Sequence, residues 1–122
     1  MDNKIWMGMT TFSSEKEGRL MAQNLINNNL AACVNIIPKI NSFFYWQGKL
    51  CAEKEFLLLI KTTGERVKKA MNKIKEEHSY QVPEIIFWPI GEVDKDYWRW
   101  VKETVTNQRK RIKKRRAKIA QK

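Results

Sequence analysis

The chain has 122 residues, of which 43% are hydrophobic, so it fits one domain with a core of ordinary size and excludes two independent cores. Its formal net charge is +11, with 24 lysines and arginines against 13 acidic residues. Two cysteines are too few for a disulfide scaffold, and no apolar run approaches the roughly 20 residues that span a bilayer, so we expect a reduced, cytoplasmic protein without a membrane span.

The first predicted elements are a strand and a helix. Apolar side chains alternate over residues 4–11, which is typical of a strand. Ser14 with Glu17 three residues later has the form of a capping box, and apolar residues at helical spacing follow it. This helix should end near residues 27–29, because three consecutive asparagines favour turns over a helix interior.

A long hairpin is predicted next. Residues 30–46 are rich in β-branched and aromatic side chains and indicate a long strand. Pro38 cannot donate a hydrogen bond to a neighbouring strand, so the strand should bend there. Residues 47–49 form the turn, and residues 53–61 return as the third strand.

The second half of the chain repeats the order of the first. Thr62 followed by Glu65 has the form of a second capping box, which predicts a helix that ends by His78. Residues 84–89 form a short apolar strand between prolines, and Asp94 can cap a last helix. The residues of this helix expected to face inward are Tyr97, Trp98, Val101 and Val105.

The predicted order is β-α-β-β-α-β with an additional C-terminal helix. Two βαβ halves of this kind indicate an α+β, ferredoxin-like fold with both helices on one face of an antiparallel sheet. The sequence supplies no helix for the opposite face, and none for the aromatic residues 43–46 of the hairpin. Exposed apolar surface and long strand edges favour association, so we predict self-assembly.

The positive charge is concentrated at the C-terminus. Residues 107–122 hold nine of the 24 basic side chains and no acidic one, which leaves residues 1–106 as a nearly neutral domain. We expect this basic tail to be disordered when free and to bind a polyanion such as a nucleic acid backbone. An anionic lipid surface and a merely solubilising extension are the alternatives. The side chains expected to contact the polyanion are Arg109, Lys110, Arg111, Lys113, Lys114, Arg115, Arg116 and Lys118.

Three sequence blocks carry a family resemblance. They are LAACVNIIPKINSFFYWQGKL at residues 30–50, EFLLLIKTT at residues 55–63 and HSYQVPEIIFWPI at residues 78–90, followed by Tyr97 and Trp100. With them the domain resembles the CutA family of divalent-cation tolerance proteins. The resemblance implies a ferredoxin-like subunit in a tight trimer, with hairpins that reach across to neighbouring subunits and an architecture similar to the PII signalling proteins.

The resemblance implies a function without catalysis. Family members are linked to tolerance of copper and other divalent metals, and no firmly established catalytic activity comes with it, so we expect neither an enzyme nor a required cofactor. His78 is the only histidine and lies where some members have a His-His pair assigned to copper, although Glu77 takes the other place here. One subunit offers too few soft ligands for a closed site. A trimer can bring Glu77, His78 or Glu84 together with groups of a neighbour, whereas the simpler alternative is a hydrogen-bonded histidine near an interface.

A cleft between subunits is the second candidate site. Aromatic walls with a few polar groups are typical of small-ligand pockets, and several residues match family positions around the groove between subunits. The alternative is that these aromatic side chains only hold the trimer together, since tyrosine and tryptophan are enriched in interfaces. The cleft residues are Tyr45, Trp46, Lys61 and Tyr80, beside His78 and Glu84.

Overall fold

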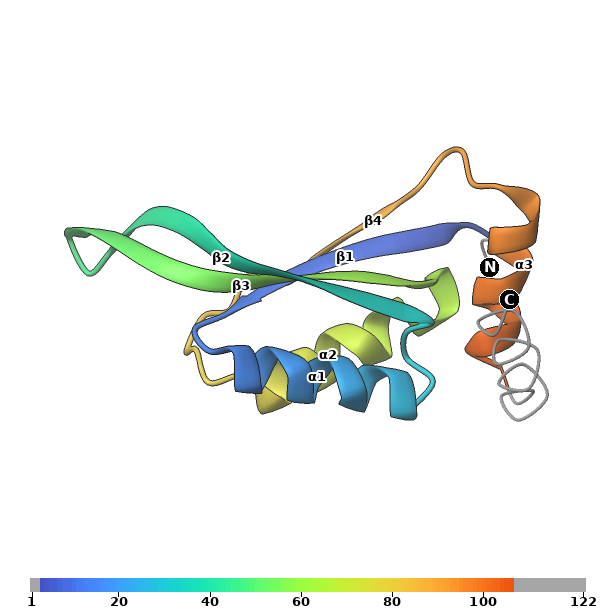
Figure 1. The fold of residues 1–122 in the computed structure, drawn as a ribbon, viewed down its shortest axis with the longest axis horizontal. Helices are drawn as coiled ribbons and strands as arrows, with labels where there is room; N and C mark the ends of the chain where they lie inside the picture. The colour runs from blue at the N-terminus through green and yellow to red at the C-terminus, as the bar shows by residue number, and fades with distance from the viewer. Residues whose placement is uncertain (1–2, 107–122) are drawn as a thin grey trace.

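A computed structural model describes residues 3–106 and shows one antiparallel sheet, two helices against one of its faces and a third helix at its end (Figure 1). The basic tail predicted for residues 107–122 lies outside the described residues. None of the described helices is long and apolar enough to cross a membrane. In chain order the elements are β1 (Ile5–Phe12), α1 (Glu15–Asn27), β2 (Cys33–Trp46), β3 (Lys49–Thr63), a 3₁₀ turn (Gly64–Arg66), α2 (Val67–Glu77), β4 (Ile86–Pro89) and α3 (Lys95–Thr104).

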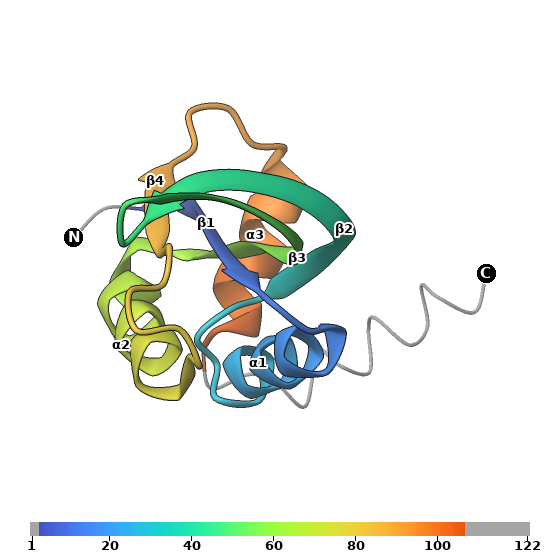
Figure 2. The same ribbon diagram turned by 90° about the vertical axis from the view of Figure 1, so that its left-hand side faces the viewer.

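The strands lie in the order β2-β3-β1-β4, and every neighbouring pair is antiparallel. Strand β3 therefore lies between β1 and β2, and β1 lies between β3 and β4, so each βαβ half is interleaved with the other. Helices α1 and α2 lie side by side against one face of the sheet (Figures 1 and 2). The predicted α+β fold with an antiparallel sheet and an additional C-terminal helix is confirmed.

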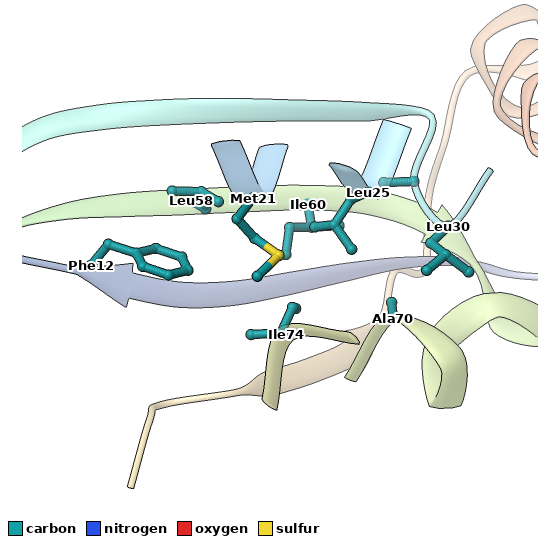
Figure 3. Packing of buried hydrophobic residues seen from close by; sticks show 9 residues of the cluster. Phe12, Met21, Leu25, Leu30, Leu58, Ile60, Ala70 and Ile74 are labelled. Carbon is teal, nitrogen blue, oxygen red and sulfur yellow. The ribbon is translucent and has the colours of Figure 1, made fainter. Parts of the chain in front are cut away.

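The main core fills the space between the sheet and these two helices (Figure 3). Side chains at every second position of β3 point toward the helices, and residues three or four apart on each helix point back toward the sheet. Full burial of one such aliphatic side chain is worth about 1.5–3 kcal/mol. The buried residues of this core are Phe12, Met21, Leu25, Leu30, Ala31, Leu58, Ile60, Ala70 and Ile74.

The first helix begins and ends as its sequence predicts. Ser14 is the N-cap, and its hydroxyl oxygen accepts a hydrogen bond from the Glu17 backbone N–H at 3.2 Å. The helix ends at Asn27, and Asn29 adopts the left-handed conformation with φ 58°. Asparagine tolerates this conformation better than most residues, which explains the helix stop.

The predicted second capping box is wrong. Thr62 still belongs to β3, and its buried hydroxyl donates to the Leu30 carbonyl oxygen at 2.7 Å instead of capping a helix. The chain passes through the 3₁₀ turn before α2 begins at Val67, and the α2 N-terminus carries no side-chain cap. The Thr62 side chain faces the core from β3, so its hydroxyl needs a buried acceptor and is not free to cap α2.

The hairpin bends at Pro38 as predicted. Ile37 pairs with Leu57 and Ile40 pairs with Glu55, so two residues of β2 stand opposite one residue of β3. This β-bulge lies beside the end of β1, and from there residues 40–55 continue as a two-stranded hairpin arm without a third strand. The arm is longer than predicted, because Gln47 and Gly48 form a tight two-residue turn with positive φ angles and β3 starts at once.

Helix α3 packs on the other side of the sheet at one end. The Asp94 carboxylate caps it by accepting hydrogen bonds from the Asp96 and Tyr97 backbone N–H groups, both at 3.1 Å. Val101 and Val105 are buried against Ile5, as predicted. The prediction that Tyr97 faces inward is wrong: its side chain is 37% exposed and lies beside the Trp100 ring, with centroids 5.6 Å apart.

The rest of that sheet face, which we call the open face, is not covered by any described helix (Figure 1). Cross-strand partners share a face, so the strand register gives its rows of side chains. One row is Cys33, Lys61, Met7 and Trp88, and the next is Asn35, Leu59, Met9 and Ile86. A third row is Ile37, Leu57 and Thr11.

The contact between β1 and β4 gives a direct test of this packing. A methyl group at Gly8 would lie 2.3 Å from the Phe87 ring, whereas one at Gly91 would meet no atom within 4 Å. We expect Gly8→Ala to lower the free energy of unfolding by about 1–3 kcal/mol through overpacking, and Gly91→Ala to leave it nearly unchanged. Urea unfolding measures both. Equal effects of the two substitutions would show that the Phe87 ring does not pack closely against Gly8.

Candidate functional site

Polar side chains gather where β1 ends. The segment between α2 and β4, residues 78–85, passes the C-terminal end of β1 on its way to the sheet edge (Figure 1). It therefore brings His78 and Tyr80 to the start of the hairpin arm, where Glu55 has lost β1 as a neighbouring strand. We call His78, Tyr80, Glu55 and Phe12 the strand-end cluster.

His78 joins this segment to β1 through both of its ring nitrogens. Nδ1 accepts a hydrogen bond from the Tyr80 backbone N–H at 3.0 Å, so Nε2 carries the proton and donates to the Thr11 carbonyl oxygen at 2.7 Å. The ring also stacks on Phe12, with centroids 4.1 Å apart. Burial lowers the pKa of His78, which favours this neutral tautomer.

Tyr80, which is half-buried, pairs with the buried carboxylate of Glu55. The phenol oxygen donates to the Glu55 carboxylate at 2.5 Å, and Glu55 is only 5% exposed. Burial raises the pKa of Tyr80 well above its usual range, and the hydrogen bond to Glu55 adds to the effect. A buried carboxylate needs such a donor, because an unpaired one costs several kcal/mol.

The proposed metal ligands lie apart within one subunit. The Glu77 carboxylate contacts the Lys73 ammonium and accepts a hydrogen bond from the Asn24 amide at 3.0 Å; the bond to Lys73 lowers the pKa of Glu77. Glu84 is exposed, and within residues 3–106 no three His, Cys, Asp or Glu side chains are grouped to hold a metal ion. A cation at His78 would have to displace one of its two hydrogen bonds, so these residues do not form a ready metal site in a single subunit.

The predicted cleft residues are also separated. Tyr45 and Trp46 lie at the tip of the hairpin arm and are 75% and 42% exposed. Lys61 lies eleven residues along β3 from Leu50, the partner of Tyr45, which is roughly 35 Å at 3.3 Å per residue. Of the predicted set, Tyr80 alone lies in the strand-end cluster beside His78.

Sequence reasoning missed Glu55 and Asn35. Glu55 opens the apolar run EFLLLIK. A carboxylate on a strand that is otherwise apolar indicates a polar partner elsewhere in the fold, and this is the signal that could have identified Glu55. Asn35 lies opposite Leu59, and its amide oxygen accepts a hydrogen bond from the Lys61 ammonium. The register that joins Asn35 to Lys61 depends on which strands pair, and a single strand does not carry that information.

Comparisons with known proteins agree on one family. The family model described as CutA1 divalent ion tolerance protein matches residues 6–104. The divalent-cation tolerance protein CutA of Thermus thermophilus is 41% identical over 95 residues, which are 78% of this chain and 92% of that protein. The CutA protein of Archaeoglobus fulgidus is 41% identical over 105 residues, covering 86% of this chain and 99% of its own length.

Solved structures give the same result. A structure described as the periplasmic divalent cation tolerance protein CutA from Archaeoglobus fulgidus superposes with a TM-score of 0.81 at 38% identity, covering 84% of this chain and 99% of the other. CutA1 from Oryza sativa superposes with a TM-score of 0.82 at 32% identity, covering 87% of this chain and 99% of the other.

The strand-end cluster predicts a coupling between Tyr80 and Glu55. Tyr80→Phe leaves the buried carboxylate without its phenol donor, so we expect the free energy of unfolding to fall by about 1–3 kcal/mol. The loss should be smaller when Glu55→Gln is already present, because a neutral amide tolerates burial better than a carboxylate. Urea unfolding of the double-mutant cycle measures the coupling, with exposed Glu53→Gln as the matched control. Equal losses in all backgrounds would contradict the pairing.

Proposed function

The chain belongs to the CutA1 divalent ion tolerance family, and from this premise we propose that it serves divalent-cation tolerance as a non-catalytic binding module assembled as a homotrimer. The proposal includes a PII-like arrangement of ferredoxin-like subunits with ligand sites between them. It rests chiefly on one observation, the apolar open face of the sheet.

The open face and the hairpin arm both leave large apolar side chains exposed in the described subunit. On the open face, Ile37, Ile86 and Trp88 are 41%, 49% and 38% exposed. The arm carries four consecutive aromatic residues, 43–46, with exposures from 40% to 75%, so both of its faces are apolar. A two-stranded hairpin is marginally stable by itself, and contiguous apolar surface marks an association site. Neighbouring copies of this chain are the occupants that both surfaces require.

The shape of the arm favours a ring. An arm that contacts the sheet of a neighbour uses a different surface from the one that receives it, so the contact is heterologous. Heterologous contacts close into a ring when the rotation between neighbouring subunits closes, and the family resemblance points to three subunits. In such a ring Tyr45 and Trp46 of one subunit can approach Lys61 of the next, which the roughly 35 Å between the Leu50 and Lys61 positions forbids within one chain.

We propose that divalent cations, copper included, act at the boundary between subunits and not inside one subunit. His78 uses both nitrogens and Glu77 is held by Lys73 and Asn24, so an incoming cation needs further ligands from a neighbour. We also propose a cytoplasmic setting, because Cys33 and Cys51 are free thiols. The solved Archaeoglobus relative is described as periplasmic.

Assembly is tested by placing a charge on the open face. Ile37→Glu places a carboxylate at a half-exposed position of the open face. In an isolated subunit the carboxylate stays in contact with water, whereas a neighbouring subunit would bury it without a partner. We expect wild type to sediment as a trimer and the variant as a monomer with an unchanged circular dichroism spectrum. Leu20→Glu, at a position 55% exposed on α1 in the helix layer, is the matched control and should remain trimeric. A monomeric wild type would overturn the proposed assembly.

Copper binding is tested at the single histidine. Calorimetry with Cu(II) and Cu(I) compares wild type with His78→Ala, and we expect at least a tenfold weaker affinity in the variant if the imidazole is a ligand. Tyr80→Phe is the control, because it disturbs the same cluster and keeps the imidazole. Equal affinity in wild type and His78→Ala would exclude His78 as a ligand.

A second candidate function belongs to the basic tail, which concentrates nine cations without an acid in residues 107–122. We propose that it binds nucleic acid through the phosphate backbone. If six or more phosphates are contacted, log affinity should fall against log salt with a slope of about −4 to −5. A salt-titrated gel shift compares the full chain with residues 1–106. Identical behaviour of the two would remove this function.

A further inference from the structure

Lys61 is the one cation in the rows of the open face described above. Its cross-strand neighbours are Cys33 on β2 and Met7 on β1, and Trp88 follows Met7 on β4. Leu59 lies two residues before it on the same face. Lys61 is half-buried, so its aliphatic stem packs among these side chains while the ammonium group needs polar partners.

The polar groups around Lys61 are rich in donors and poor in acceptors. The Lys61 ammonium donates to Asn35 Oδ1, and the Cys33 thiol contacts the same oxygen at 3.9 Å. An ammonium has three N–H donors, and the Asn35 amide nitrogen has two. One amide oxygen cannot satisfy this set. A group with several acceptor oxygens would complete it.

Charge leads to the same requirement. Three salt bridges among residues 3–106 join Arg19 to Glu15, Lys73 to Glu77 and Arg99 to Asp96, and none of these three involves Lys61. Glu55 shares a strand face with Lys61, but it lies six residues away, roughly 20 Å along the strand, and holds Tyr80. The positive charge of Lys61 therefore has no counter-charge on β3.

Burial of the open face makes this a strong constraint. When a neighbouring subunit covers the face, the ammonium loses water, and an unpaired buried charge costs several kcal/mol. We propose that the open face binds an oxyanion, a carboxylate or phosphate group, at Lys61 and Asn35. This inference deepens the proposed function and rests on its assembly, because the neighbour encloses the site.

Two sources can supply the oxyanion. A small anionic ligand can enter between subunits, or a carboxylate of the neighbouring copy can pair with Lys61. In both cases the charge of Lys61 favours the assembled protein. Without either partner, the buried charge of Lys61 would destabilise the assembled protein, and an apolar side chain of similar length would stabilise the interface better.

The test uses the full chain as wild type, Lys61→Met and Lys61→Arg. The matched control is Lys68→Met, at an exposed position of α2. Thermal unfolding is followed in inorganic phosphate and in sodium chloride of equal ionic strength, and sedimentation gives the oligomeric state. Phosphate held by the basic tail affects all four proteins equally and cancels in the comparison.

For a small ligand we expect phosphate to raise the unfolding midpoint of wild type, Lys61→Arg and Lys68→Met by about 3 °C more than that of Lys61→Met. For a carboxylate of the neighbour we expect no phosphate-specific shift, and Lys61→Met alone should dissociate at a higher protein concentration than the others. The inference is overturned if Lys61→Met assembles and unfolds like wild type in both salts. A monomeric wild type that still shows the phosphate shift would overturn the trimer and keep the oxyanion site.

Discussion

One constraint governs this molecule: a sheet has two faces, and its two main helices cover only one of them. Helices α1 and α2 bury the face that carries Leu58 and Ile60, and α3 reaches only the far end of the other. An uncovered face of an antiparallel sheet can be polar, yet the open face carries Met9, Leu59 and Ile86 across β1, β3 and β4. The uncovered surface, the unsupported arm and the proposed trimer all follow from this imbalance.

The strand-end cluster marks the boundary between the supported sheet and the arm. Where β1 stops, residues 78–85 take its place beside β3, and they do so with a stacked imidazole and a phenol in place of strand hydrogen bonds. These contacts attach the segment after α2 to the end of β1 and to Glu55 at the base of the arm. The cluster is therefore a structural joint between the supported sheet and the arm.

Local rules predicted most of the fold, because the residues concerned act within a few positions of themselves. As predicted, Ser14 caps the first helix, the asparagines at 27–29 end it, and β2 bends at Pro38. The same local rules gave a wrong prediction for Thr62, because its hydroxyl donates to the Leu30 carbonyl oxygen, which is distant in the sequence, instead of capping a helix. The candidate site was harder to predict. The strand-end cluster draws its members from β1, β3 and the segment after α2. The hairpin tip and Lys61 lie far apart in one subunit and can meet only in the proposed ring.

The hairpin arm has a consequence for how the protein must be handled. In the proposed trimer, residues 40–55 gain most of their apolar contacts from other chains, so the ordering of the arm depends on protein concentration. Dilution should loosen the arm before it disturbs the helix-covered half of the sheet. A measured stability of this protein then applies only to the protein concentration at which it was measured. The rate at which the arm refolds is then set by how often subunits meet.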